Sequence, residues 1–197
     1  MPGVRAIDLT RREFCAATLS ACFLPVAGTL AAPFVAPLGK ALRAESPDDV
    51  LIVEFSDAGV RTGAARLPKV VKRDSEWRTM LSPLAYSVAR LADTERAFSG
   101  AYWNLHDAGI FRCVCCGTAL FSSAHKFDSG TGWPSFWQPI APENVQGPKA
   151  QHPGADNTEV TCRRCDAHLG DIFDDGPRPT GLRYCIDSVS LRFVKRA

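Results

Sequence analysis

Two short cysteine pairs decide the fold of this chain: Cys113-Val114-Cys115-Cys116-Gly117 and Cys162-Arg163-Arg164-Cys165-Asp166. The outer cysteines of each pair stand three positions apart, so that one tight turn can present both sulfurs. Four such sulfurs complete a tetrahedron around one structural Zn²⁺ and leave no open position for a substrate. Because 45 residues separate Cys116 from Cys162, we expect the metal to cross-link two distant hairpins, so that its binding free energy becomes folding free energy. The alternative interpretation is two surface disulfides.

Length and composition bound the class of protein. The chain has 197 residues, of which 46% are hydrophobic and 22% are charged, with a formal net charge of +2. These values fit one ordinary globular domain with a core. The balanced charge provides no basic stripe, so we expect no nucleic-acid partner. The body of the chain has no uninterrupted apolar run of about 18 or more residues, which argues against a membrane-spanning domain.

The first 45 residues differ from the rest of the chain. Thr10-Arg11-Arg12-Glu13-Phe14 sets two arginines before a mildly apolar run that ends near Ala32. This order predicts a twin-arginine signal peptide and leader over residues 1–45, followed by a catalytic domain over residues 46–197. We therefore expect the twin-arginine export machinery as a partner and a periplasmic location. The alternatives are a basic start to a buried helix, and lipid attachment at Cys22.

Export also bears on the cysteines. Removal of the signal leaves the four paired cysteines together with Cys115 and Cys185. An exported protein can oxidise its cysteines to disulfides. The twin-arginine route carries folded proteins, however, so the metal can be loaded in the reducing cytosol before export.

The pattern of the remaining residues predicts a mainly β domain with two short N-terminal helices. Strands are expected at residues 50–55, 111–114, 119–121, 158–162, 182–185 and 189–194. The first helix is expected to begin at a cap on Asp74 or Ser75 and to end near Leu81. Ser82 and Pro83 then predict a cap and a first turn for a second helix. Residues 144–158 are polar and predict a surface loop.

Cys185 lies outside the metal set and is a candidate nucleophile. Arg183 and Asp187 lie two residues to either side, so that on a strand all three side chains point to one face. A guanidinium close to a thiol favours the thiolate and lowers the pKa of the cysteine. The alternative interpretation is a small buried hydrophobic residue.

Longer motifs around these cysteines resemble the methionine sulfoxide reductase B family over residues 76–194, approximately. They run in order through the first cysteine pair, residues 126–136, residues 162–170, residues 180–185 and Ser190-Leu191-x-Phe193. The resemblance implies two antiparallel sheets in an open barrel that is stapled by zinc far from the chemistry. It also implies a catalytic cysteine on a C-terminal strand.

The resemblance implies a repair enzyme that reduces methionine-R-sulfoxide, in proteins or free, to methionine. Cys185 as thiolate attacks the sulfoxide sulfur, the oxygen is protonated, and Cys185 is left as sulfenic acid. The matching positions imply that Trp133 cups the substrate methyl group, that His168 lies in the active site and binds substrate, and that Arg183 lies near the nucleophile. We expect a monomer whose partners are oxidised proteins and a thioredoxin-like or other thiol reductant.

Three positions depart from the family pattern. Asp171 stands where the family commonly has a second histidine, so the proton donor is Asp171, His168 or a water. Asp187 stands where the family usually has asparagine, and its charge opposes thiolate formation unless Arg183 pairs with it or it is protonated. These two departures predict slower turnover or a displaced pH optimum.

The third departure concerns recycling of the oxidised cysteine. Thr131 stands where many family members carry a resolving cysteine, which leaves Cys115 as the sole candidate. Cys115 sits inside a metal knuckle, so we expect an external thiol to reduce the sulfenic acid directly. The competing hypothesis for the whole chain is a zinc-stabilised binding module with a degenerate active site.

Overall fold

The computed structural model describes residues 46–147 and 158–196. The expected export signal and Cys22 lie outside the described residues, and so does most of the expected loop at 144–158. Within the two described ranges, none of the helices combines the length and apolar character that crossing a membrane requires.

The described residues are mainly β, as predicted, with two helices before most of the strands. The strands are β1 (Val50–Phe55), β2 (Arg61–Leu67), β3 (Gly109–Cys113), β4 (Ala119–Ser122), β5 (Lys126–Phe127), β6 (Ser135–Phe136), β7 (Val145–Gln146), β8 (Glu159–Cys162), β9 (His168–Phe173), β10 (Arg183–Ile186) and β11 (Leu191–Lys195). The helices are α1 (Asp74–Met80) and α2 (Pro83–Leu91), and short 3-10 turns are η1 (Ser123–His125), η2 (Pro142–Asn144) and η3 (Ser188–Ser190).

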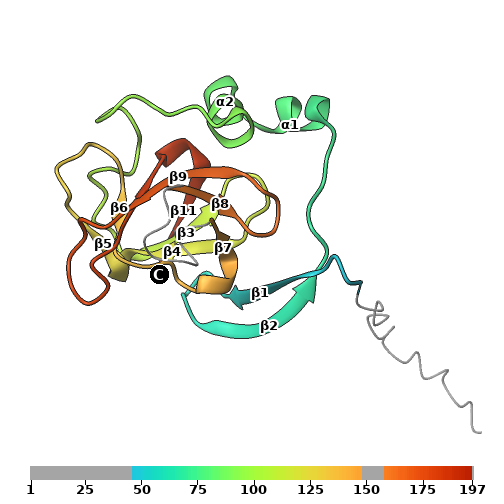
Figure 1. Cartoon of the computed structure of the whole chain (residues 1–197), viewed down its shortest axis with the longest axis horizontal. Coiled ribbons are helices and arrows are strands. Elements are labelled where there is room, and N and C mark those ends of the chain that lie inside the picture. The colour runs from blue at the N-terminus through green and yellow to red at the C-terminus, as the bar shows by residue number, and fades with distance from the viewer. Residues whose placement is uncertain (1–45, 148–157, 197) are drawn as a thin grey trace, which may run out of the picture. The chain divides into compact units, whose positions relative to one another are not determined.

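The strands pair antiparallel in three sheets, where two were predicted. One sheet has six strands in the order β5-β6-β10-β9-β8-β7, one has three in the order β11-β3-β4, and β1 pairs with β2 alone (Figure 1). The third sheet exists because the sequence RTGAARL forms β2 by backbone pairing with β1, although it lacks the run of branched residues typical of strands. The open-barrel arrangement stays a prediction.

Aromatic side chains join the two larger sheets. Phe136 of β6 stacks on Phe121 of β4 with ring centroids 4.5 Å apart, and it meets Phe111 of β3 edge-on at 5.0 Å. All three side chains are completely buried, and each ring stabilises the fold by roughly 1.5–3 kcal/mol on burial. Because β6 also pairs with β10, this core fixes the strand that carries Cys185.

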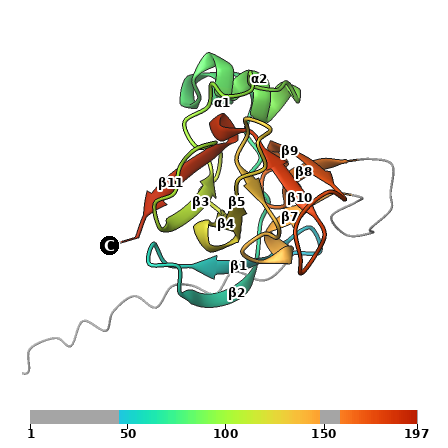
Figure 2. The ribbon, with the colours of Figure 1, turned by 90° about the vertical axis from the view of Figure 1, so that its left-hand side faces the viewer.

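The helix α2 begins as predicted. Ser82 is its N-cap, with the hydroxyl accepting the Ala85 backbone N–H at 3.2 Å, and Pro83 occupies the first turn. This helix packs against β9 and η3. Figures 1 and 2 show both helices on the side of the domain opposite to the hairpin of β1 and β2.

The cap predicted for α1 is wrong by one residue. Arg73, in extended conformation, is the N-cap, and Asp74 already lies inside the helix. The carboxylate of Glu76 reaches back to accept the Arg73 backbone N–H at 3.1 Å. This hydrogen bond satisfies one backbone N–H at the N-terminus of α1, although the capping residue carries no hydroxyl or carboxylate. Asp74 instead accepts a hydrogen bond from Arg78 at 2.8 Å.

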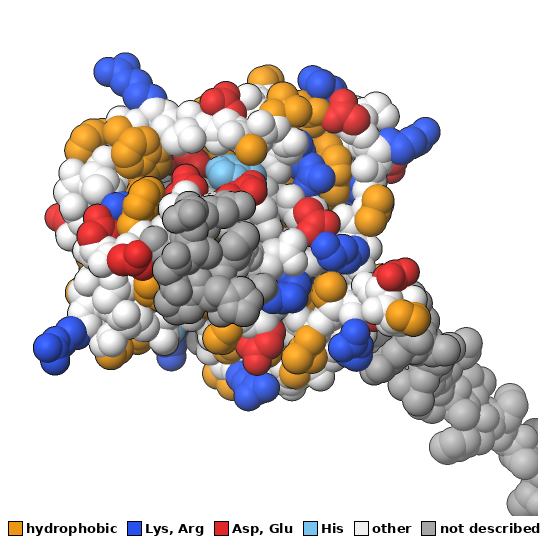
Figure 3. Space-filling view, viewed as in Figure 1, with side chains coloured by type: hydrophobic (Ala, Val, Ile, Leu, Met, Phe, Trp, Pro, Cys, Tyr) orange, Lys and Arg blue, Asp and Glu red, His pale blue; other side chains and the backbone are white. Residues whose placement is uncertain are grey.

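The surface charges are dispersed on the face that Figure 3 shows. Lysine and arginine side chains stand singly among acidic side chains there rather than in a stripe. This distribution matches the small formal net charge of +2.

Candidate active site and metal site

The two cysteine pairs form turns of the same kind. The Gly117 N–H donates to the Cys113 carbonyl at 2.9 Å, and the Asp166 N–H donates to the Cys162 carbonyl at 2.9 Å. Gly117 and Asp166 both have left-handed backbone, with φ of 76° and 55°. Glycine adopts this conformation without strain and aspartate tolerates it better than most residues, so the local sequence permits both turns.

The folded chain brings the four predicted metal ligands together. Their sulfur atoms all lie within 4.8 Å of one another, and the Cys113–Cys165 and Cys116–Cys162 sulfur pairs are each 3.6 Å apart. Zinc–sulfur bonds of about 2.3 Å place tetrahedral sulfurs roughly 3.8 Å apart, so the cluster fits zinc. The disulfide interpretation is wrong, because every described cysteine is a free thiol.

The metal cluster is tied to the helices as well as to two hairpins. Arg90 of α2 donates to the Cys165 carbonyl at 2.8 Å, and its guanidinium lies 5.0 Å from the ring of buried Trp77 in α1. Cys115, which is 6% exposed, contacts Cys113 and Cys165 through its thiol. Cys115 is therefore packed against the cluster, as its place in the knuckle predicts.

A cavity of about 130 Å³ opens beside Cys185. It is lined by Thr94, Trp133, Gly170, Asp171, Phe173, Cys185 and Asp187. Four of these residues, Cys185, Asp171, Asp187 and Trp133, were predicted from the sequence as site residues. The cavity is small and its walls are mostly apolar, which suits a single short side chain.

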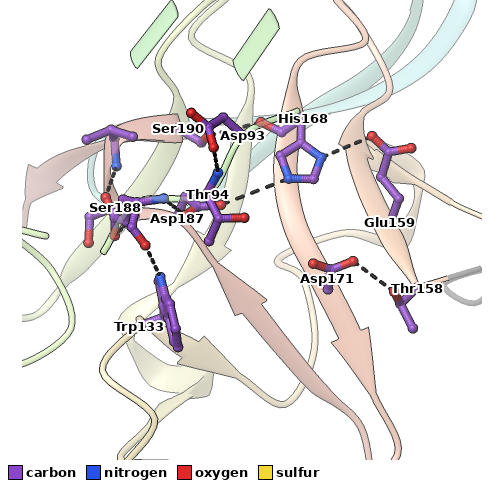
Figure 4. Close-up of polar contacts among 12 residues, drawn as sticks. Asp93, Thr94, Trp133, Thr158, Glu159, His168, Asp171, Asp187, Ser188 and Ser190 are labelled. Carbon is purple, nitrogen blue, oxygen red and sulfur yellow. Dashed lines mark hydrogen bonds and ion pairs between the residues drawn. The ribbon is translucent and has the colours of Figure 1, made fainter. Parts of the chain in front are cut away.

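The register of β9 and β10 positions two of the lining residues. Cys185 lies directly opposite Asp171 in the pair, so that both side chains point to the same face. A Cβ atom on Gly170 would meet the Cys185 carbonyl oxygen at 2.1 Å, so this close approach of the strands requires glycine. Asp171 accepts a hydrogen bond from the Thr158 hydroxyl at 2.8 Å (Figure 4).

The surroundings of Cys185 raise the pKa of its thiol, which corrects the prediction of a lowered value. Burial is the largest cause, and the nearby charge of Asp187 acts in the same direction. Arg183 acts in the opposite direction, as predicted, and so does the Thr131 hydroxyl, whose oxygen lies 3.9 Å from the sulfur. These two favourable contacts do not compensate for the loss of water around the thiol.

Arg183 pairs with a carboxylate that the sequence analysis did not single out. Its guanidinium donates two hydrogen bonds to Asp175, each 2.8 Å long, and lies 4.4 Å from the ring centroid of Phe173. Arg183 therefore does not pair with Asp187, which was one of the two alternatives. The cavity-lining Phe173 had no signal of its own in the sequence either.

Asp187 is buried, with 2% of its surface exposed. One carboxylate oxygen accepts the Glu95 backbone N–H at 2.9 Å, and the other lies 4.0 Å from Nε2 of His168. Burial raises the pKa of Asp187 to about 6, and the charges of Glu95 and Asp171 add to the effect. The remaining alternative, a protonated Asp187, is thus accessible near neutral pH.

His168 lies behind Asp187 rather than in the wall of the cavity. Its Nδ1–H donates to a Glu159 carboxylate oxygen at 3.0 Å, while Nε2 faces Asp187 (Figure 4). Of the described residues, those lining the cavity do not include His168, and its direct contact with substrate stays a prediction. The sequence did not reveal Glu159, because the bulge between Val160 and Thr161 sets its pairing with β9.

Glu95 is the residue of the site that the sequence least reveals. It is 2% exposed, and its carboxylate accepts the backbone N–H groups of Ser188 and Val189 at 2.7 and 3.1 Å. Its carbonyl accepts the indole N–H of Trp133 at 3.1 Å. One residue in the loop after α2 thus orients both Asp187 and Trp133, and no sequence spacing predicts such contacts.

Comparisons with known proteins agree on one family. Residues 81–195 match the family model of the SelR domain. A protein from Herminiimonas arsenicoxydans named "Peptide methionine sulfoxide reductase MsrB" is 57% identical over 125 residues, which cover 64% of this chain and 91% of that protein. A protein of the same name from Pseudomonas fluorescens is 52% identical over 130 residues, covering 66% of this chain and all (100%) of that protein.

The four-sulfur cluster predicts one bound Zn²⁺ per chain. Substitution Cys116→Ser should abolish the stoichiometric metal and lower the midpoint of thermal unfolding by roughly 10 °C or more, because binding free energy is lost from the folded state. Elemental analysis and thermal unfolding of the purified protein measure both effects.

Cys115→Ser is the matched control for this test, since Cys115 lies in the same turn but outside the four ligands. It should keep the metal. Retention of full metal content by Cys116→Ser, or equal loss in both variants, would contradict the assignment.

Proposed function

The chain belongs to the SelR domain family and is a peptide methionine sulfoxide reductase, and we propose that it reduces the R epimer at sulfur through the thiol of Cys185. The observation that carries this proposal is the cavity in which Cys185 faces Trp133. The indole supplies an apolar wall for the methyl group of the substrate, and the cysteine lies where it can reach the substrate sulfur.

The proposed step transfers one oxygen atom between two sulfurs. The thiolate sulfur of Cys185 bonds to the sulfoxide sulfur while the sulfoxide oxygen takes up a proton. The resulting hydroxyl then passes to the sulfur of Cys185, and both the new sulfur–sulfur bond and the sulfur–oxygen bond of the substrate break. Cys185 is oxidised by two electrons to sulfenic acid, and the sulfoxide is reduced to the thioether of methionine. Atoms and electrons balance, because one thiol and one sulfoxide give one sulfenic acid and one thioether.

We propose that Asp187 carries the proton from the thiol of Cys185 to the oxygen of the sulfoxide. Burial raises the pKa of both Cys185 and Asp187, so near neutral pH the pair holds one proton, which rests on the thiol. Asp187 takes this proton as the thiolate forms and gives it to the sulfoxide oxygen. His168, whose Nε2 lies 4.0 Å from Asp187 and whose Nδ1 is held by Glu159, stabilises the ionised carboxylate between cycles.

With this role, Asp187 supplies the proton donor that the resemblance places at position 171. The departure at position 187 thus compensates for the departure at position 171. The resemblance places a second histidine where this chain has Asp171 and an asparagine where it has Asp187. Asp171 is half-buried and accepts the Thr158 hydroxyl, whereas Asp187 is buried and surrounded by charges. The proton donor has thus moved from one wall of the cavity to another.

Arg183 has a positioning and electrostatic role in this scheme. Its two hydrogen bonds to Asp175 fix the guanidinium beside Cys185, where its charge stabilises the thiolate once it forms. The contact between Thr131 and the sulfur adds a hydroxyl on the other side of the thiol. Arg183 and Thr131 therefore oppose the effect of burial on the thiol.

We further propose that the protein is exported. The paired arginines before an apolar run support a twin-arginine signal over residues 1–45 and a periplasmic location. A zinc cluster loaded before export would keep its four thiols out of disulfides. Oxidised proteins would be the substrates and a thioredoxin-like or other thiol would be the reductant, while the monomeric state stays a prediction.

The first test compares both sulfoxide epimers. The purified protein should reduce methionine-R-sulfoxide in a peptide and leave the S epimer unchanged, and Cys185→Ser should abolish the activity while it keeps the metal. Chiral chromatography of the products measures both epimers. Binding of the sulfoxide without any conversion would instead support the binding module with a degenerate site.

The second test concerns the pH dependence. The rate should fall as pH drops through about 6, because protonation of Asp187 removes the acceptor for the thiol proton. Asp187→Asn should lower the rate at pH 7 by roughly 10²-fold, the usual size of a lost general acid or base, and should remove the acidic limb near 6. Steady-state rates across pH measure both effects.

The control for this test is the background Asp171→His, which restores the histidine of the family pattern. In that background Asp187→Asn should cost much less, because a second proton donor is present. Superimposable pH profiles for the parent and Asp187→Asn would contradict the role of Asp187.

The third test concerns recycling. Cys115 is buried beside the cysteine cluster and is not among the described residues that line the cavity, so Cys115→Ser should keep multiple turnovers with a small dithiol reductant, at a rate within about twofold of the parent. A normal first turnover followed by arrest would show that Cys115 resolves the sulfenic acid. Quenched-flow measurement of the first and later cycles distinguishes the two results.

A further inference from the structure

Phe98 has an unusual backbone for an aromatic residue and an unusually exposed ring. Its φ is 63°, and 55% of its surface is exposed. Most residues with a Cβ disfavour this left-handed region. Glycine adopts it freely, and asparagine and aspartate tolerate it better than other residues. The conformation of Phe98 is therefore imposed by its surroundings, and observed outliers of this kind cluster at functional sites.

The surroundings hold Phe98 over the segment that leads into the cavity. Its N–H donates to the Gly132 carbonyl at 2.8 Å, and its ring meets Trp103 edge-on at 5.2 Å. A Cβ atom on Gly132 would lie 2.7 Å from the Phe98 nitrogen and 2.8 Å from its ring, so the approach requires glycine. The next residue, Trp133, lines the cavity. The exposed ring thus lies one residue from the wall of the site.

The chain before Phe98 is anchored to the site as well. Thr94 lines the cavity, and Glu95 joins Asp187 and Trp133 through its own N–H and carbonyl groups. Residues 94–98, the rim segment, therefore run from the cavity to the exposed ring with fixed contacts at both ends. Figure 4 shows Thr94 close to Asp187.

Building on the proposed reduction of methionine sulfoxide, we propose that the Phe98 ring binds an apolar side chain of the substrate polypeptide next to the methionine sulfoxide. The cavity of about 130 Å³ holds little more than the sulfoxide side chain, so the flanking residues of a polypeptide must lie outside it, over the rim. The Phe98 ring is exposed but already held by its contacts. It can therefore pack against an apolar side chain with little loss of its own conformational entropy.

The chemistry of the substrate supports an apolar partner for this ring. Methionine is found mainly in protein interiors, where apolar residues recur at the period of the strand or helix, or run on without a break in a fully buried strand. An oxidised methionine in an unfolded segment therefore often has an apolar residue within one to four positions. Free methionine sulfoxide has none, so the ring would distinguish polypeptide substrates from the free amino acid.

Two substitutions distinguish the effect of the Phe98 ring from the effect of its left-handed backbone. Phe98→Asn removes the ring but keeps a residue that tolerates left-handed backbone, whereas Phe98→Leu keeps an apolar side chain. Val60→Ala is a matched control, because Val60 is 60% exposed and lies in the turn between β1 and β2. The substrates are a pentapeptide with methionine-R-sulfoxide between leucines, the same peptide with serines, and free methionine-R-sulfoxide.

Phe98→Asn should raise KM for the leucine peptide about tenfold with kcat unchanged, the pattern of lost uniform binding from one apolar contact. The serine peptide and the free amino acid should change by less than about twofold, and Phe98→Leu should restore most of the affinity, whereas Val60→Ala should match the parent. Equal effects on all three substrates would show that Phe98 shapes the cavity, and no effect on the leucine peptide would show that it makes no contact. Both results overturn the proposal.

These outcomes are separate from the failure of the proposed function. A parent protein that reduces none of the three substrates would refute the reduction itself. A parent that reduces all three, without a Phe98-dependent preference for the leucine peptide, would refute the docking role alone.

Discussion

The four-sulfur cluster is the interaction on which the rest of the structure depends. It joins the turn between β3 and β4 to the turn between β8 and β9, which are distant in sequence and belong to different sheets. β9 begins three residues after Cys165, and its further residues include Gly170 and Asp171 in the cavity wall. A metal ion bound by these four sulfurs would therefore also hold one wall of the site, while the proposed chemistry takes place at Cys185.

The site itself is governed by burial rather than by attraction between opposite charges. The thiol of Cys185 and the carboxyl of Asp187 face one small cavity, and the loss of water raises the pKa of each. Arg183, the obvious partner for either charge, is held by Asp175. In the proposed mechanism, a single proton shared between the sulfur of Cys185 and the carboxylate of Asp187 supplies both the base that the thiol needs and the acid that the sulfoxide oxygen needs.

The sequence predicted the parts of the protein that spacing encodes. Cysteines three positions apart predicted the knuckles, a run of β-favouring residues predicted β1, alternating residues predicted β8 and β11, and Ser82-Pro83 predicted the start of α2. It did not predict β2 or β9, because backbone pairing and a glycine between close strands form them without a run of branched residues. It also did not predict Glu95 or Glu159, whose contacts with Asp187, Trp133 and His168 arise in the tertiary fold. The pKa of Cys185 was predicted in the wrong direction because a sequence shows which charges are near a group but not how much water is lost around it.

The central claim is that Cys185 accepts the oxygen of the sulfoxide. Mass spectrometry of the protein after one turnover, without reductant, tests this claim most directly. The peptide containing Cys185 should gain one oxygen atom in step with the methionine formed, and the R epimer alone should produce this change. Formation of methionine with no oxidation of Cys185, or oxidation that falls on Cys115 or on a cysteine of the cluster instead, would contradict it.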